Sequence, residues 1–128
     1  MKATHLADVT AWGQLDRTEV AVRLVSLLVG GATATCGITD LELARSAVDD
    51  AEHLLITAER DMFPRISIDD DVLVRALEVQ RQLLPQQVSI TALIVAAAAE
   101  RSGLVVLHHD DDFERIARVT GQPLERVG

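Results

Sequence analysis

The segment that most constrains this fold lies near the C-terminus, where an apolar run ends in three consecutive carboxylates. Residues 105–107 read Val-Val-Leu, residues 110–112 are all aspartate, and a helical pattern begins at Phe113. A strand that leads directly into an acidic helix start is typical of α/β sheets, in which the carboxyl ends of parallel strands share one edge. Carboxylates at such an edge are suitable ligands for hard divalent cations. The segment therefore predicts an α/β fold with an acidic edge and suggests a metal-dependent site.

Short apolar runs alternate with helical patterns along the whole chain. Strands are predicted at residues 4–8, 32–36, 66–68 and 104–107, with a last extended piece at 124–127. Helices are predicted at 20–28, 38–47, from 49 until Pro64 breaks the run, and at 72–84, 92–101 and 113–117, with Thr39 or Asp40 as N-cap of the second. This alternation predicts one α/β domain over residues 1–128, with a mostly parallel central sheet covered by helices on both faces.

The charge balance argues against broad binding to a polyanion without excluding a nucleic-acid substrate. The 128 residues carry 12 basic and 20 acidic side chains, a net charge of −8. A local arginine patch can still hold phosphates where metal ions offset the acidic pocket. Trp12, Phe63 and Phe113 are the only aromatic residues, so no platform for stacking bases is expected. Any contact with nucleic acid is therefore expected to depend on arginine.

Cysteine use and hydropathy predict a cytoplasmic protein. Cys36 is the only cysteine, which excludes an intramolecular disulfide, and its apolar neighbours indicate a buried small side chain rather than a nucleophile. The N-terminus lacks the cationic start and long apolar run of a secretory signal, and no apolar run is long enough to span a bilayer. No membrane partner is therefore expected.

Carboxylates from three parts of the chain are expected to meet at the sheet edge. Asp8 follows the first strand, Glu42 lies one turn into the helix after the second, and Asp110, with Asp112 beside it, follows the strand 104–107. Phosphodiester hydrolysis suits such a cluster, because Mg²⁺ or Mn²⁺ neutralises the phosphate, positions water and stabilises the leaving oxygen. Taken singly, each aspartate of 110–112 is more simply explained as a solvated charge or a helix cap.

Four segments together carry a family resemblance, and they lie at residues 6–12, 38–47, 89–94 and 107–113. In this order and spacing they resemble the PIN-domain ribonucleases, and most closely the VapC toxins of bacterial VapBC toxin–antitoxin pairs. The resemblance covers essentially the whole chain. It implies a Mg²⁺- or Mn²⁺-dependent endoribonuclease that cuts structured RNA such as transfer or ribosomal RNA. It also implies a homodimer that a VapB-type antitoxin holds inactive.

The resemblance also assigns roles to individual residues. Asp8 matches the first acid of the family, Glu42 the second and Asp110 the last, and these three are the implied metal ligands. Asp112, beside Asp110, is implied as a further catalytic acid. Thr10 matches a hydroxyl that supports the site. The resemblance thus implies the same acidic edge that the strand ends predict.

One position departs from the family pattern. The third acid of the family opens the helix after a Ser-Ile-x element, and this chain has Ala92 there. A methyl group neither coordinates a cation nor orients water, and neighbouring Thr91 offers only a neutral hydroxyl. The departure implies that activity is impaired or abolished, either in a natural member or by a deliberate change, and the sequence leaves both open.

Alternative functions have weaker support in the sequence. Adjacent His108 and His109 point to opposite faces of a strand, which disfavours a transition-metal site. A receiver domain needs a catalytic lysine, and the only lysine is Lys2. Gly30-Gly31 lacks the Lys and Ser or Thr of a phosphate-binding loop. The remaining rival is a non-catalytic protein of PIN-like fold that binds an antitoxin or RNA through its acidic groove.

Overall fold

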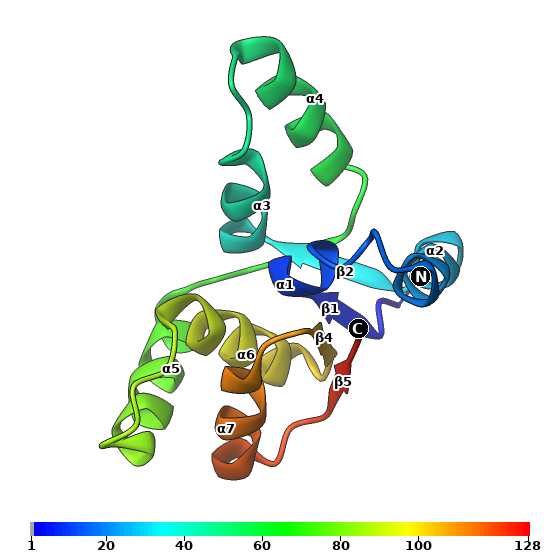
Figure 1. The fold of residues 1–128 in the computed structure, drawn as a ribbon. Coiled ribbons are helices and arrows are strands. Elements are labelled where there is room, and N and C mark those ends of the chain that lie inside the picture. Colours follow the sequence, from blue (N-terminus) through cyan, green and yellow to red (C-terminus); the bar gives the residue numbers. More distant parts are fainter. Residues whose placement is uncertain (1) are drawn as a thin grey trace.

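The computed structural model describes residues 2–128 as a five-stranded parallel sheet flanked by seven helices (Figure 1). The strands are β1 (His5–Ala7), β2 (Thr33–Cys36), β3 (Arg65–Ile66), β4 (Val105–His108) and β5 (Leu124–Arg126). The helices are α1 (Val9–Trp12), α2 (Thr18–Val29), α3 (Gly37–Ala44), α4 (Asp50–Arg60), α5 (Asp70–Leu83), α6 (Ile90–Ser102) and α7 (Asp111–Thr120). All five predicted extended segments are present, whereas α1 was not predicted because its single turn is too short for a periodic pattern.

The strands lie in the order β3-β2-β1-β4-β5, and every neighbouring pair is parallel. The prediction of a parallel α/β sheet is therefore confirmed. β1 is central, with Leu6 beside Ala34 of β2 and Val106 of β4. Because all strands run the same way, the residues that follow β1, β2 and β4 emerge at one edge of the sheet. This edge receives Asp8, α3 and Asp110.

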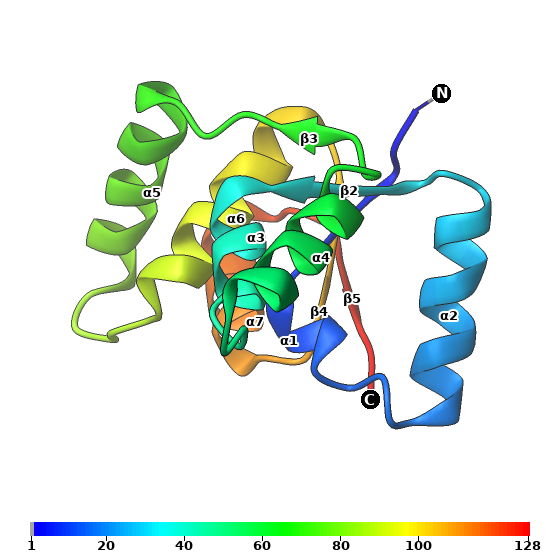
Figure 2. The same cartoon turned by 90° about the horizontal axis from the view of Figure 1, so that it is seen from above.

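Helices cover both faces of the sheet, and each face has its own apolar core. Leu6 and Val106 belong to the larger core with α5, α6 and α7, while the next residues, Ala7 and Leu107, face the smaller core with α1 and α2. Successive strand residues point to opposite faces, so β1 and β2, which are covered on both sides, are buried at every residue. In Figure 2, α2 lies on one side of the sheet and α5, α6 and α7 lie on the other.

Local capping explains most helix starts. Asp49, Asp69, Ser89 and Asp110 are N-caps whose side chains accept a backbone N–H of the first turn. Gly103 ends α6 in the left-handed conformation at φ 67°, as its position after a helical run predicts. Within residues 2–128, no helix combines the length and apolar character required to cross a bilayer.

The predicted start of the second long helical segment is wrong. α3 begins at Gly37 with Cys36 as N-cap, and neither Thr39 nor Asp40 caps it. Thr39 is buried inside the helix, and the carboxylate of Asp40 accepts the Thr35 hydroxyl at 2.8 Å. Leu41, although apolar, is 71% exposed. Tertiary contacts rather than local capping therefore decide the register of α3.

Candidate active site

A pocket of about 130 Å³ opens at the carboxyl edge of the sheet. The residues that line it come from the starts of α1, α6 and α7 and from α3, namely Asp8, Val9, Thr10, Glu42, Ser89, Thr91, Ala92 and Asp110. The structure thus brings Asp8, Glu42 and Asp110 to one pocket together with Ala92, as the strand-end argument predicts. The larger hollow beside Phe63 is lined by a single acid, Glu59.

Asp8 is the most buried of these acids, with 2% of its surface exposed. It ends β1 and caps α1, and its Oδ2 accepts the amide of Thr10 at 3.0 Å and the Thr10 hydroxyl at 2.6 Å. Burial raises the pKa of the Asp8 carboxyl above its ordinary value, the Thr10 hydrogen bonds partly offset this, and the charge of Asp110 raises the pKa further. A cation beside Asp8 would offset both the burial of its charge and the repulsion from Asp110.

Thr10 links Asp8 to the loop that carries Asp110. Its hydroxyl donates to Asp8 and accepts the amide N–H of His109 at 2.9 Å. One side chain therefore holds the carboxylate after β1 and the backbone after β4 in a fixed relation. These two hydrogen bonds are how Thr10 would support the site, as expected from the resemblance.

Asp110 lies at the start of α7 and uses one carboxylate oxygen as a cap. Its Oδ1 accepts the amide of Asp112 at 2.9 Å, and its own amide donates to Nδ1 of His108 at 3.1 Å. Burial lowers the pKa of the His108 imidazole, which favours the neutral ring, and Nδ1 of this ring accepts the Asp110 amide. His109 instead contacts the carbonyl of Val127 through its Nδ1 at 2.8 Å. The two histidines diverge, as expected for neighbours at a strand end.

Asp112 does not line the pocket. Its Oδ2 accepts the amide of Ser89 at 2.8 Å, and its Oδ1 pairs with Nη1 of Arg115 at 2.8 Å. Both carboxylate oxygens are thus engaged, Oδ1 within α7 and Oδ2 in a link to the start of α6. The catalytic role expected for Asp112 stays a prediction, and the geometry favours a role in holding the pocket wall.

Glu42 and Ala92 face the pocket from α3 and α6. The hydroxyl of Thr91 donates to Glu42 Oε1 over a long 3.4 Å contact. Ala92 is the third residue of α6, is buried, and donates its amide to Ser89 Oγ at 3.2 Å. Its methyl group contributes no polar atom to the pocket wall.

The donor chemistry fits a hard cation, but the donors are fewer than a complete site needs. The three acids offer only carboxylate oxygens, which suit Mg²⁺ and Mn²⁺ better than softer metals. Within residues 2–128, no three or more Asp, Glu, His or Cys side chains lie close enough together to hold an ion. Asp8 and Asp110 interact electrically, Glu42 stands on α3, and Ala92 leaves its part of the wall without an oxygen.

The sequence did not predict the structural roles of two residues near the pocket, Ser89 and Arg60. The amide of Ser89 donates to Asp112 across the pocket wall, while its hydroxyl caps α6. Arg60 is buried behind α1 and α3, whereas an arginine in the last turn of a helix ordinarily reads as an exposed partner of the helix dipole. No local pattern distinguishes it from an exposed arginine.

The chain is similar to known proteins over nearly its whole length. Residues 9–119 match the PIN domain family. Ribonuclease VapC21 of Mycobacterium tuberculosis is 41% identical over 132 aligned residues, which cover 99% of this chain and 96% of the relative. Ribonuclease VapC18 of the same species is 36% identical, with 94% and 92% covered.

Solved structures share the same fold at low sequence identity. VapBC2 from Rickettsia felis, bound to a DNA fragment from their promoter, aligns with a TM-score of 0.77 at 13% identity and covers 100% of both chains. DNA-bound VapBC from Salmonella typhimurium aligns with a TM-score of 0.76 at 18% identity, with 97% and 98% covered. The chain therefore belongs to the PIN-domain family. Within this family, the full-length relatives place it among the VapC-type ribonucleases.

Proposed function

We propose that this chain is the toxin of a VapBC-type pair and an endoribonuclease that uses Mg²⁺ or Mn²⁺ to cut structured cellular RNA. The observation that carries the proposal is the pocket at the carboxyl edge, where Asp8, Glu42 and Asp110 come from three separate elements. Carboxylates that repel one another in a partly buried pocket are favoured only when a cation or a proton offsets their charge. The family membership supports phosphodiester hydrolysis as the chemistry of this pocket.

Each pocket residue has a distinct task in this proposal. Asp8 and Asp110 hold the cation, and Thr10 fixes the Asp8 carboxylate through the hydroxyl contact at 2.6 Å. Glu42, opposite them on α3, orients the attacking water and accepts its proton. When bound, the cation supplies charge neutralisation at the scissile phosphate. Asp112 keeps the α6 wall in place through the Ser89 amide.

Ala92 lowers the activity in this proposal. The methyl group supplies no ligand, so the cation is held by fewer oxygens and water is less well oriented. Loss of one preorganised charged group in an active site costs a factor on the order of 10² in rate. The chain therefore retains a weak site rather than none, and a carboxylate at position 92 should restore it.

The partners proposed are a VapB-type antitoxin and a second copy of the chain, with cellular RNA in the cytoplasm as substrate. Several of the solved structures that share this fold are toxin–antitoxin complexes, which supports the antitoxin. A basic side chain of the antitoxin is expected to enter the acidic pocket, where a charge-assisted contact is strong. Exposed apolar side chains beside the groove between α5 and α6 support the dimer, namely Leu73, Leu77 and Ile90.

The test compares RNA cleavage by the parent chain and by Ala92→Asp on total cellular RNA with Mn²⁺ or Mg²⁺. The variant is expected to cut faster by at least a factor on the order of 10², equivalent to about 2.7 kcal/mol of transition-state stabilisation. Ala92→Asp combined with Asp8→Asn controls for contaminating nuclease. If the folded variant binds metal and leaves RNA intact, the ribonuclease proposal fails.

A second function is favoured by the incomplete ligand set. With Ala92 in the wall and no cluster of three ligands within residues 2–128, the pocket can serve as an acidic groove that binds a basic antitoxin segment or RNA without turnover. Two measurements together distinguish the ribonuclease from the interaction protein. They are the cleavage assay and the affinity of the chain for antitoxins in which each basic residue of the tail is replaced by alanine. Tight binding that depends on one such residue, with no cleavage by Ala92→Asp, would favour the interaction protein.

A further inference from the structure

One positive charge is enclosed at the end of α4. Arg60 is the only buried residue of that helix, with 2% of its surface exposed, whereas Leu54 and Leu55 are 60% and 73% exposed. In Figure 1, α3 and α4 lie together above the sheet, and α4 extends away from it. The protein therefore anchors the end of α4 through a charged side chain, although burying a charge is costly unless it is paired and hydrogen-bonded.

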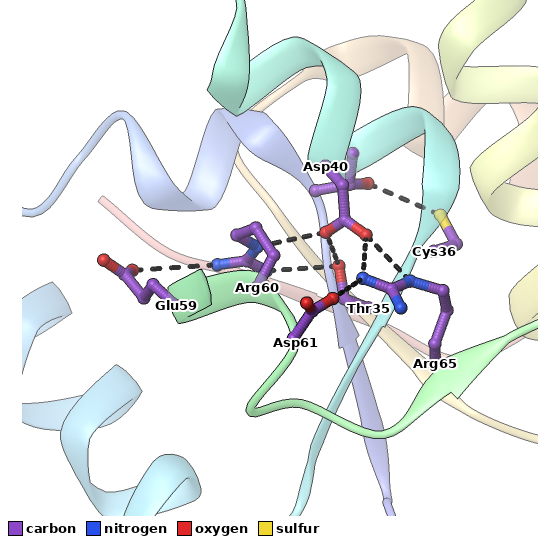
Figure 3. Close-up of polar contacts among 8 residues, drawn as sticks. Thr35, Cys36, Asp40, Glu59, Arg60, Asp61 and Arg65 are labelled. Atoms are coloured by element: carbon purple, nitrogen blue, oxygen red, sulfur yellow. Dashed lines mark hydrogen bonds and ion pairs between the residues drawn. The ribbon is translucent and has the colours of Figure 1, made fainter. Parts of the chain in front are cut away.

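Stacking and hydrogen bonds meet that requirement for the Arg60 guanidinium. Its central carbon lies 4.9 Å from the ring centroid of Trp12 and 4.3 Å from that of Phe63. Its Nε donates to Asp40 Oδ1 at 3.1 Å, and its Nη2 donates to the Thr35 hydroxyl at 3.1 Å (Figure 3). A planar group with donors along its edge can stack and pair at the same time, which a lysine cannot do.

These contacts reach two of the three elements that carry pocket acids. Trp12 is the last residue of α1, which Asp8 caps, and Asp40 lies in α3 two residues before Glu42. α1 has only four residues, so it has no stability of its own and depends on its tertiary contacts. Residues two apart on a helix do not share a face. Asp40 can therefore hold Arg60 while Glu42 lines the pocket.

We propose that Arg60 is a positioning residue of the acidic pocket, because it joins Trp12 to Asp40 and thereby sets the separation of α1 and α3. Asp8 and Glu42 would then keep their distance across the pocket without a direct contact between them. The consequence for cation binding rests on the proposed function. We call the link from Trp12 through Arg60 to Asp40 the clamp between α1 and α3. The clamp is a property of the fold and is testable without metal.

The experiment compares Arg60→Met with Arg65→Met as the matched control. Methionine keeps much of the length of arginine and removes the charge and donors. Arg65 also pairs with Asp40, at 2.8 Å, but it lies on β3 with 44% of its side chain exposed and contributes no guanidinium stacking on Trp12. Both variants remove one Asp40 ion pair, so a difference between them reports the buried contacts with Trp12, Phe63 and Thr35 that Arg60 makes and Arg65 does not.

Two readouts are taken, amide hydrogen exchange in the metal-free proteins and Mn²⁺ affinity by paramagnetic resonance. Arg60→Met is expected to speed exchange in α1 and α3 at least about tenfold relative to Arg65→Met, with α6 and α7 unchanged. The Mn²⁺ dissociation constant is expected to rise about fivefold or more in Arg60→Met and to change less than about twofold in the control. Faster exchange confined to α4 would overturn the proposal, since Arg60 would then only anchor that helix.

Arg60→Lys guards against a methionine variant that fails to fold. Lysine keeps the charge beside Asp40 and cannot stack between the rings while it binds Thr35. Loosening of α1 in this variant supports the clamp, and exchange equal to that of the parent overturns it. If α1 and α3 loosen as expected while the parent chain binds no Mn²⁺, the metal proposal fails and the clamp stands.

Discussion

Substitution of Ala92 by aspartate is expected to change stability in opposite directions without and with a divalent cation. Ala92 is the third residue of α6, so a carboxylate there stands in the first turn, where the helix dipole favours an anion by about 0.3 to 1 kcal/mol. The new side chain enters a pocket of about 130 Å³. Steric cost is therefore expected to be small.

Repulsion from the neighbouring acids opposes this gain in the metal-free protein. Two unit charges about 5 Å apart interact by about 3 kcal/mol at an effective dielectric constant of about 20. The pKa of Asp8 is already raised by burial and by Asp110, so proton uptake absorbs part of the added repulsion. We expect a net loss of about 1 to 2 kcal/mol, which lowers the Tm of a chain of this length by about 3 to 10 °C.

With a bound cation, Ala92→Asp should stabilise the folded protein instead of destabilising it. Mn²⁺ at a hundred times its Kd stabilises the folded state by about 2.7 kcal/mol, which exceeds the expected loss. Thermal unfolding by circular dichroism measures the parent, Ala92→Asp and the neutral isostere Ala92→Asn with and without Mn²⁺. The aspartate variant should melt below the parent without metal and above it with metal. Equal responses of the aspartate and asparagine variants to Mn²⁺ would refute the reasoning, because the added charge would then not be a ligand.

Three further predictions follow from single side chains. Because the pKa of Asp8 is raised in the folded state, that state binds the Asp8 proton more tightly than the unfolded state and loses stability as pH rises. Urea unfolding should therefore show that Asp8→Asn stabilises the metal-free protein at about pH 7 but not below about pH 4. A variant less stable than the parent at neutral pH would contradict this. Asp112→Ala should cost about 0.5 to 1.5 kcal/mol in the same assay, because it removes the acceptor of the solvent-exposed Ser89 amide, and the control Asp111→Ala, which loses only exposed ion pairing with Arg126, should cost less. Leu77→Glu should give a monomer by light scattering if the α5 face joins two copies, and an unchanged mass would exclude that face.

The sequence by itself determined the order of the strands and of every helix except α1, together with several helix ends. Asp49, Asp69 and Ser89 act as caps within three residues of the amides they bind, and Gly103 needs only its own φ angle to end α6. These signals are local, so they can be recognised in the sequence without knowing which segments pack against them. The acidic edge was also predictable, because parallel strands present their carboxyl ends together.

Only the tertiary structure decided which acids face the pocket and what holds its walls. Asp110 and Asp112 are two residues apart, yet the first lines the pocket and the second binds the Ser89 amide on α6. Asp40 looked like a helix cap and instead pairs with the buried Arg60, 20 residues away in sequence. The direction of such side chains depends on elements that meet only after folding, since burial and pairing across elements outweigh local preference.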